Sequence, residues 1–411
     1  MNNLIIAATR KTLGVIANSG RQGGPIEMTP DAGRFLIAFC GSGTGHMTQS
    51  VAFCRMMQAR GLSLAGVITD SDMAQSLVDE VITPLGVPLL VLPAITIVTK
   101  KGVLPPHRVL ANARVVDLGL KRESDRIRSF LAESRAGLII NMWQISLGVF
   151  IHRNALPRDV RVMHIAAQCS QARGATTALR TKEMPLSPMA AAAKGTVEVM
   201  CAVFASSGTL VPISASGADG TLAPIIDLPE PVSPECPPLI LCYFLTQAPA
   251  RQLERMLHKQ PLVGVEVHCF TPEALKPPRG RPLSLHSHAK QRGLFVELFG
   301  RCTAVLCSTG NETIWEAVCR GVPVLTLPTS AHGEQILNAV VHSRALPHLV
   351  RTRSSLSMVD VTWLSTFEHS EATRRESAAL RERCAALAAS GGLDAFFAKA
   401  SDASIAVEVS P

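Results

Sequence analysis

The chain has 411 residues, of which 47% are hydrophobic and 18% are charged, so it can bury a large core and is most simply divided into two domains. Aromatic residues make up only 4%, which argues against a carbohydrate-binding module built on aromatic platforms. The formal net charge of +8 favours anionic partners such as nucleotide diphosphates or anionic lipid surfaces. Because the sequence has no long Lys/Arg block and no basic stretch interleaved with aromatics, we expect no nucleic acid partner.

Cysteine usage and hydropathy set the expected compartment. The eleven cysteines form no Cys-x-x-Cys pair, and an odd number without a disulfide framework is typical of a reducing environment. No apolar run reaches the ~18 residues that a membrane span needs. We therefore expect a cytoplasmic protein. Two alternatives stay open: association with a membrane, and import into an organelle, because residues 1–26 are basic and carry no acid.

Alternating strand-like and helix-like stretches in the first half predict an α/β domain. Residues 1–34 are expected to be an extension, with disorder as one interpretation. A buried strand, a glycine-rich turn at residues 41–46 and a helix at residues 47–61 follow in the order typical of a doubly wound sheet. Residues 35–228 should therefore form a Rossmann-like domain. We predict its strands at residues 35–40, 64–70, 137–142, 160–167 and 197–205.

Proline marks the expected domain boundary. Residues 229–238 hold five prolines, which exclude a helix or a central strand and indicate a linker. Residues 239–370 should then form a second Rossmann-like domain, and residues 371–411 a helix and tail that pack back toward the first. The predicted strands of the second domain are residues 239–244, 265–270, 304–308 and 323–328. The predicted helices of this half are residues 246–260, 293–302, 311–321, 333–345 and 371–390.

The segment that begins at residue 304 carries the most informative pattern. A buried strand ends at Ser308, and Thr309, Gly310 and Asn311 follow as a tight turn. Gly310 lets the backbone approach a ligand closely, and Asn311 is a favourable N-cap for the next helix. The free N–H groups and positive dipole end of that helix would lie at the carboxyl end of a parallel strand. The pattern therefore predicts a diphosphate site.

Two carboxylates lie on one face of the same predicted helix. Glu312 and Glu316 are four residues apart, and a carboxylate one turn into the helix can accept two hydrogen bonds from ribose hydroxyls. The alternative for Glu312 is that it only complements the helix dipole. We expect Trp315 to be a core residue rather than a ligand contact.

The order of residues from 310 to 339 resembles the donor-binding signature of UDP-sugar glycosyltransferases. This group includes the N-acetylglucosaminyltransferase that makes lipid II, the plant galactolipid synthases and a MurG-like set of prokaryotic transferases. The resemblance implies the GT-B fold, in which two Rossmann-like doubly wound parallel-sheet domains face a central cleft. It also implies a nucleotide-sugar donor. The matching residues are, in order, Gly310, Thr313, Glu316, Ala317, Gly321, Pro323, Pro328, Glu334, Gln335, Asn338 and Ala339.

The same resemblance implies roles for single residues. The diphosphate would be held by the four loop residues 308–311, and the ribose hydroxyls by Glu316. Glu334 and Gln335 would contact the donor sugar, and Asn338 would support the loop. The chain has Thr309 where the family often has glycine or alanine, which leaves the identity of the donor sugar open. The residues assigned to donor binding are Ser308, Thr309, Gly310, Asn311, Thr313, Glu316, Glu334, Gln335 and Asn338.

The glycine-rich turn of the first half ends in His46. It is neither a dinucleotide fingerprint nor a P-loop, but it resembles the N-terminal loop of the same transferases. The resemblance makes His46 a candidate general base that takes the proton from an acceptor hydroxyl. Two alternatives are that it orients phosphate or acceptor, and that it only packs at the helix start. The residues of the loop are Gly41, Ser42, Gly43, Thr44 and Gly45.

Several polar residues at strand ends could support this histidine. A histidine base needs a partner that fixes its tautomer, and Asp70 and Asp72 are candidates for that partner. Asn141 is expected to close a strand over the cleft. His164 and Gln168 are expected to be buried polar groups with satisfied hydrogen bonds.

The expected activity is that of a hexosyltransferase that moves a sugar from a UDP-sugar to an acceptor hydroxyl. We expect inversion, no metal ion and no cofactor, because the helix dipole can stabilise the leaving diphosphate. The acceptor could be a small molecule, a glycan or a lipid. Residues 89–110 combine an apolar run with basic residues, which fits either a buried strand with a solvated loop or a patch on a membrane surface. The alternative functions are a sugar-nucleotide 2-epimerase and a non-catalytic nucleotide-sugar-binding homologue.

Overall fold

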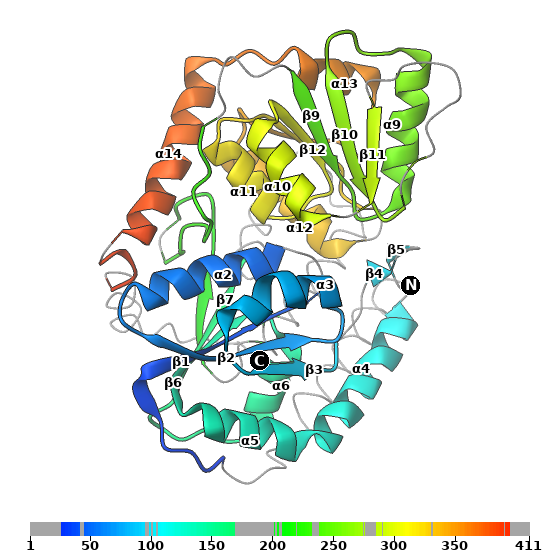
Figure 1. Ribbon diagram of the computed structural model, residues 1–411. Coiled ribbons are helices and arrows are strands. Elements are labelled where there is room, and N and C mark those ends of the chain that lie inside the picture. The colour runs from blue at the N-terminus through cyan, green and yellow to red at the C-terminus, as the bar shows by residue number, and fades with distance from the viewer. Residues whose placement is uncertain are drawn as a thin grey trace, which may run out of the picture.

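The described chain forms two lobes, one above the other in Figure 1, with the later strands in the upper lobe and the earlier ones in the lower. The last long helix, α14, runs along one side from the upper lobe toward the lower (Figure 1). The computed structural model describes residues 26–41, 45–94, 98–99, 102–103, 106–168, 201, 204, 208–218, 220–231, 238–273, 275, 285–289, 291–329, 332–389 and 391–394.

The lower lobe is built on a six-stranded sheet in which all paired strands are parallel, with the order β3-β2-β1-β6-β7-β8. This order reverses between β1 and β6, as in doubly wound nucleotide-binding sheets. Its strands are β1 (Asp31–Phe39), β2 (Ser63–Asp70), β3 (Leu89–Leu92), β6 (Ala136–Met142), β7 (Arg161–Ala166) and β8 (Thr209–Pro212). The other elements are α2 (Gly45–Gln58), α3 (Gln75–Leu77), η1 (Val78–Ile82), η2 (Thr83–Leu85), β4 (Val98–Thr99), β5 (Gly102–Val103), α4 (Pro106–Arg122), α5 (Ser124–Ser134) and α6 (Ile145–Arg153).

The upper lobe repeats the same topology with the order β11-β10-β9-β12-β13-β14, again with parallel pairs throughout. The order reverses between β9 and β12. Its strands are β9 (Leu239–Tyr243), β10 (Glu266–Thr271), β11 (Leu285–Ala289), β12 (Ala304–Cys307), β13 (Val324–Thr326) and β14 (Val350–Thr352). Its helices are α9 (Gln247–Lys259), α10 (Arg292–Arg301), α11 (Glu312–Cys319), α12 (Gly333–Ala345), α13 (Met358–Ser365) and α14 (Glu371–Ala388).

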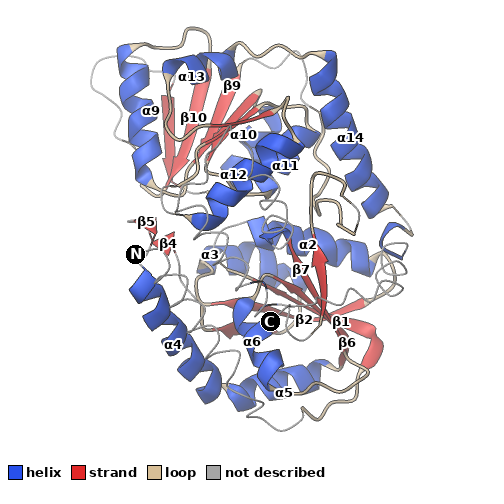
Figure 2. Cartoon of the chain, turned by 180° about the vertical axis from the view of Figure 1, so that it is seen from behind, coloured by secondary structure: helices blue, strands red, loops and turns tan. Residues whose placement is uncertain are grey.

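Helices cover both faces of each sheet, as the views from the front and from behind show (Figures 1 and 2). Alternate residues of one strand pack into two different hydrophobic cores. Phe35 and Ile37 of β1 pack with α2, whereas Leu36 packs with α4, α5 and α6. In the upper sheet, Leu241 packs in the core that contains α11, and Cys242 packs in the core that contains α9. The predicted α/β fold with two doubly wound parallel sheets is therefore confirmed.

Two strands differ from the prediction. A strand was predicted at residues 197–205, but Cys201 and Phe204, the residues of that run that the structure describes, are helical. An all-apolar run fits a buried helix as well as a buried strand, and periodicity does not separate the two. The edge strand of the lower sheet is β8 instead. In the upper lobe, β11 was not predicted, because its sequence Leu-His-Ser-His-Ala has little β-propensity.

Some expectations fall on residues outside the described part of the chain. These are residues 1–25 of the extension, most of the Pro-rich linker (residues 232–237) and the tail beyond residue 394. The loop residues Ser42, Gly43 and Thr44 also lie outside it. Strand β1 begins at Asp31, four residues before the predicted start of the first strand.

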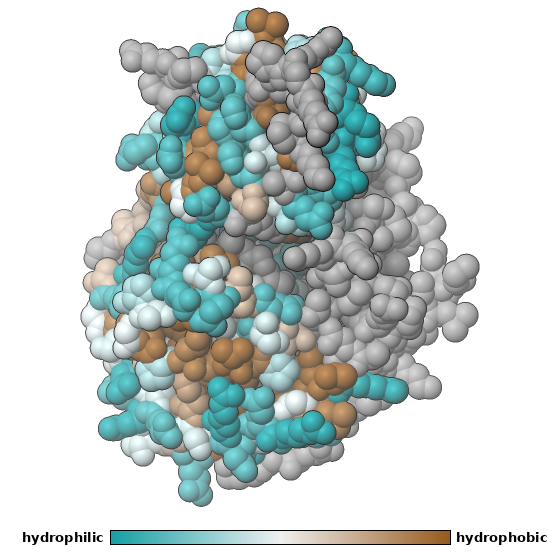
Figure 3. All heavy atoms as spheres, turned by 45° about the vertical axis from the view of Figure 1, so that its right-hand side comes forward, coloured by the Kyte–Doolittle hydropathy of each residue, from teal (hydrophilic) through white to brown (hydrophobic). Residues whose placement is uncertain are grey.

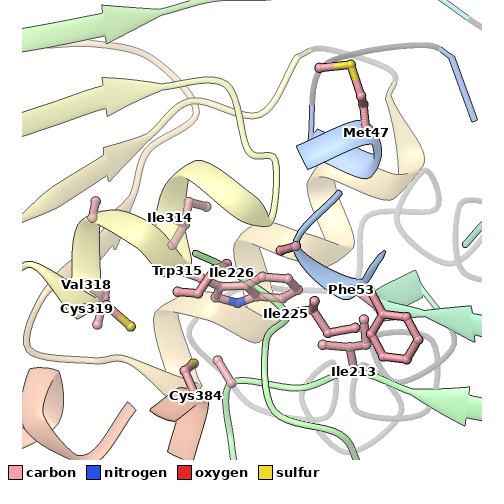
Figure 4. Close-up of a cluster of buried hydrophobic side chains, with 14 of the residues drawn as sticks. Met47, Phe53, Ile213, Ile225, Ile226, Ile314, Trp315, Val318, Cys319 and Cys384 are labelled. Atoms are coloured by element: carbon pink, nitrogen blue, oxygen red, sulfur yellow. The ribbon is translucent and has the colours of Figure 1, made fainter. Parts of the chain in front are cut away.

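A hydrophobic core joins the two lobes. Figure 4 shows the Trp315 indole among side chains from several elements, including Phe53 of α2, Ile225 of the lower lobe and Cys384 of α14. Trp315 is only 1% exposed, and Phe53 and Ile225 are fully buried. Helices α2 and α11, which follow the two predicted ligand loops, are therefore packed against each other through a shared core.

Helix α14 adds polar contacts that cross between the lobes. Arg383 donates a hydrogen bond to the carbonyl oxygen of Ala215 in the lower lobe, and Arg381 donates to that of Pro229. Arg60 of the lower lobe forms an ion pair with Asp394, with Nε and Oδ1 separated by 3.2 Å. The last helix thus contacts both lobes.

The surface differs between the lobes on the face shown in Figure 3. Apolar side chains gather in the lower half of this view, whereas the described surface of the upper half is largely hydrophilic. Within the described part of the chain, no helix is both long enough and apolar enough to span a bilayer. In the predicted interfacial segment, residues 89–110, the side chains from residue 95 onward lie outside the described part of the chain.

Candidate functional site

Both predicted ligand loops lie where a sheet reverses its strand order. The glycine-rich loop follows β1, next to β6, and the loop that starts at Ser308 follows β12, next to β9. Ligands of doubly wound sheets bind in the crevice at the carboxyl ends of the strands at this reversal. The loops meet, because a Cβ atom on Gly45, the first residue of α2, would lie 2.1 Å from Oε2 of Glu312, the first residue of α11. The ends of the two loops therefore lie next to each other, where the two lobes meet.

Among the described residues, the N-terminus of α11 has no side-chain cap. Asn311 occupies the N-cap position, as predicted, but its side chain makes no capping hydrogen bond. Its Oδ1 lies 2.8 Å from Nε2 of His342, which is buried in α12. Burial lowers the pKa of His342 to about 4, so its ring is neutral at pH 7. The N–H groups of the first turn, which have no acceptor within a helix, are left for other partners.

Hydrogen bonds to other segments hold the loop before α11 in place. Ser308 Oγ accepts a hydrogen bond from the Leu245 amide, at 3.1 Å, and Asn338 Nδ2 donates to the Thr309 carbonyl, at 3.2 Å. Thr309 is fully buried, and its Oγ1 has no hydrogen-bond partner among the described residues. Among the described residues, a Cβ at Gly310 would have only Glu312 Oε2 within 4 Å, at 3.9 Å, outside its two chain neighbours. No other described side chain or backbone atom fills the space above Gly310.

Glu312 of the upper lobe contacts the lower lobe. Its Oε1 accepts a hydrogen bond from Nε2 of Gln49 in α2, at 2.9 Å. Its carboxylate thus lies near the N-terminal ends of both α2 and α11, where helix dipoles favour negative charge. The absence of a side chain at Gly45 is what allows this approach. A carboxylate occupies part of the position that the sequence predicted for a diphosphate.

Removing the charge of Glu312 should strengthen anion binding at this position. Glu312→Gln keeps an oxygen that can accept from Gln49 but removes the repulsion of a bound anion. We expect the affinity for inorganic pyrophosphate to rise about tenfold, equivalent to about 1.4 kcal/mol. Titration calorimetry measures this, with Glu297→Gln, an exposed carboxylate of α10, as the control. An unchanged affinity would place the anion site away from α11.

Glu316 lies one turn further along α11 and is half-buried. Burial raises its pKa to about 8, the negative charges of Glu312 and Asp227 add to the rise, and Arg292 opposes it. A carboxyl group held in a desolvated position against other negative charges is typical of functional sites. Neither Asp227 nor Arg292 was predicted to lie near Glu316, and only the fold brings them to this helix.

Three predicted polar residues meet on the other side of the cleft. Gln168 follows β7 and is fully buried. Its Nε2 lies 2.9 Å from Oε1 of Glu334 in α12 and 3.4 Å from Nε2 of His46 in α2. A residue expected to be a satisfied core group therefore connects the proposed acceptor-side histidine to a proposed donor-side carboxylate. Gln335, next to Glu334, uses its Oε1 to accept from the Thr329 amide, at 2.7 Å.

The other candidate residues of the lower lobe form a separate network. Asp70 accepts from Gln144 Nε2, at 3.1 Å, and from the Asp72 amide, at 3.2 Å. Burial raises the pKa of Asp70, although hydrogen bonds from backbone amides oppose the rise. Asn141 bonds to the backbone of Gln144 through both ends of its amide. Among the described residues, the partner of the His46 ring is therefore Gln168 and not either aspartate.

His164 is a core residue. It is fully buried in β7, neither ring nitrogen has a hydrogen-bond partner among the described residues, and its ring packs edge-on against Phe204 at 4.8 Å. Burial lowers its pKa to about 3. The expectation that its hydrogen bonds are satisfied is not met within the described residues. Those residues also contain no group of three or more His, Cys, Asp or Glu side chains suited to a metal ion.

Comparisons with known proteins give a likeness in structure only. No protein-family model matches the chain, and no curated protein matches its sequence. Arabidopsis thaliana UGT89C1 complexed with quercetin is similar with a TM-score of 0.60 and 14% identity, covering 90% of this chain and 98% of that one. Phytolacca americana UGT2 complexed with UDP-2fluoro-glucose and pterostilbene gives 0.59 and 12%, covering 90% and 100%. CalG4, the calicheamicin glycosyltransferase, gives 0.53 and 13%, covering 92% and 99%. At these identities the likeness establishes the fold, which is GT-B with two Rossmann-like domains.

Proposed function

We propose that this chain transfers a hexosyl group from a UDP-sugar to an acceptor hydroxyl. The observation that carries the proposal is the contact of Gln168 with both His46 and Glu334, since it joins a candidate base to a candidate sugar-binding group across the cleft. The N-terminus of α11, open above Gly310, supports a donor diphosphate beside them. Two structural neighbours are described as complexes with UDP or UDP-2fluoro-glucose, which agrees with this donor class.

The residues divide the reaction between the two lobes. His46 takes the proton from the acceptor hydroxyl while the hydroxyl oxygen attacks the anomeric carbon, so the configuration inverts and the nucleoside diphosphate leaves. The backbone N–H groups of α11 stabilise the charge on the leaving diphosphate, without a metal ion or cofactor in this scheme. Glu316 binds the ribose. Glu334 binds the sugar, and so does the NH₂ group of Gln335, because its Oε1 is taken by Thr329.

The acceptor side is proposed only as a chemical class. The base is in the lower lobe, so the acceptor hydroxyl enters between α2 and the end of β7, and the acceptor is a small molecule, a glycan or a lipid. Closure of the lobes excludes water from the reaction. We propose a cytoplasmic enzyme, with contact to a membrane surface required only for a lipid acceptor.

Substitution of His46 separates donor binding from transfer. In His46→Ala, we expect UDP release from a panel of UDP-hexoses and acceptors to fall by about 10²–10⁴-fold, the usual contribution of a general base. Affinity for UDP, measured by titration calorimetry, should stay within a factor of about two. The exposed His369 supplies the control, and His369→Ala should match the wild type in both assays.

Each alternative gives a distinct result in the same assays. Transfer at the wild-type rate by His46→Ala overturns the base role. Conversion of a UDP-hexose to its 2-epimer without an acceptor shows an epimerase. UDP binding without release under any condition shows a non-catalytic homologue, and no UDP binding by the wild type overturns the donor site.

A further inference from the structure

Gln168 has a hydrogen-bonding position that its sequence context did not predict. It lies two residues beyond β7, has no exposed surface, and directs Nε2 to Glu334 of the upper lobe and His46 of the lower lobe. Its Oε1 is buried without a partner among the described residues. The two contacts of Nε2 therefore determine how the amide is oriented.

Glu334 determines which end of the amide faces the cleft. The two ends of a glutamine amide are assigned from their hydrogen-bond partners. An ionised carboxylate accepts hydrogen bonds and donates none. With the amide turned over, its oxygen would lie against the Glu334 carboxylate, and two acceptors would face each other. The 2.9 Å contact therefore fixes the NH₂ group toward Glu334 and, at the same time, toward His46.

The orientation of the amide sets the tautomer of His46. An NH₂ group offers only donors, so the ring nitrogen that faces it, Nε2, must be an acceptor. In a neutral ring the proton is then on Nδ1. An Nε2 that carries no proton is the form that can take one from a hydroxyl. The 3.4 Å separation is long for a hydrogen bond, so an acceptor hydroxyl can replace this contact without a large loss.

We propose that Gln168 is a positioning residue that fixes His46 as the Nδ1–H tautomer, and that Glu334 holds Gln168 in the required orientation. The proposal rests on the proposed function for its catalytic meaning, but the tautomer itself is a property of the free protein. The tautomer was expected to be fixed by Asp70 or Asp72 as an acceptor, and Gln168 fixes it instead as a donor to Nε2. Because Glu334 belongs to the other lobe, the tautomer of His46 is fixed only when the two lobes are in contact.

Nitrogen NMR of the histidine ring tests this without a substrate. In full-length chain labelled with ¹⁵N-histidine, the signals of His46 are identified by their loss in His46→Asn, and spectra are recorded where the ring is neutral. The wild type should show a protonated Nδ1 and an unprotonated Nε2. Gln168→Leu should make the Nε2–H form the major one, as should Gln168→Asn, whose shorter amide cannot reach both partners. Glu334→Leu should shift the populations in the same direction.

Matched controls separate this role from a structural one. Gln75→Leu removes an exposed amide that bonds only within its own helical segment, and it should leave the His46 signals unchanged. UDP affinity of Gln168→Leu should stay close to that of the wild type while turnover falls about tenfold or more. An Nε2–H tautomer in the wild type, or the same tautomer in wild type and both Gln168 variants, overturns the proposal. If the wild type does not bind UDP, the proposed function is overturned but the tautomer result is not.

Discussion

Replacement of Glu316 by glutamine is expected to stabilise the folded chain at alkaline pH. The carboxyl group has a pKa of about 8 in the folded state, against an ordinary value of 4.5. Between these values the folded chain keeps a proton that the unfolded chain has lost, so the free energy of unfolding falls as pH rises and levels off above about pH 8. Glutamine does not titrate. The variant should therefore gain stability over the wild type progressively across this interval.

Thermal unfolding of both proteins between about pH 5 and pH 9 measures this effect. The melting temperatures should lie close together at the acid end and separate by several degrees at the alkaline end. Glu382→Gln, on the exposed side of α14, serves as the control and should follow the wild type. Parallel curves for the wild type and Glu316→Gln would show that ionisation of Glu316 does not destabilise the folded chain.

The same substitution should weaken UDP binding. A hydrogen bond to a charged group contributes about 1.5–3 kcal/mol, and glutamine keeps one oxygen that can accept from the ribose. Losing one such bond should weaken binding about tenfold to a hundredfold. Because Glu316 must lose its proton to bind in this way, wild-type affinity should rise from about pH 7 to pH 9, and that of the variant should not. Binding sites typically contain groups that destabilise the folded chain but are needed to bind the ligand.

Truncation of Trp315 is expected to have the largest effect on stability. Its indole is 1% exposed and lies in the core shared by α2, α11, α14 and the segment that contains Ile225 (Figure 4). Loss of a buried Trp side chain to alanine typically costs about 3–5 kcal/mol. Both lobes contribute to this core, so Trp315→Ala should lower the stability of both and loosen the contact of Gln49 with Glu312.

Urea unfolding followed by circular dichroism measures the loss, and Trp363→Ala provides the comparison. Trp363 is only partly buried, against the core on the α9 side of the upper sheet, and its ring contacts Arg351 at 4.1 Å. We expect Trp363→Ala to lower the free energy of unfolding by less than Trp315→Ala does. An equal or smaller loss in Trp315→Ala would mean that the two lobes are not stabilised by a common core.

The order of elements was largely predictable because local signals agree with the fold. The run from Phe35 to Gly61 predicted a buried strand and a helix on either side of a glycine-rich turn, and the structure contains that strand and that helix. The strand at Thr209–Pro212 is short and follows an apolar run that also fits a helix, so local pattern selected the wrong segment. Strand β11 is polar at an edge and gives little hydrophobic signal.

The site was only half predictable for a similar reason. The loop around Gly310 and the spacing of Glu312 and Glu316 are local features that sequence reveals. The contact of Gln49 with Glu312 joins residues 263 positions apart, and that of Gln168 with Glu334 joins residues 166 positions apart. No pattern within one segment contains such pairs. The side chain of Asn311 was expected to cap α11, but it faces His342, which comes from another helix.

A melting-temperature comparison across nucleotides tests the central claim most directly. A ligand that binds only the folded chain raises its stability, by about 2.7 kcal/mol when its concentration is a hundred times the dissociation constant. We predict that UDP and UDP-hexoses raise the melting temperature of the wild type, that uridine alone does not, and that Glu316→Gln responds less. No response to any uridine or thymidine diphosphate species would contradict a nucleotide-sugar site at the N-terminus of α11.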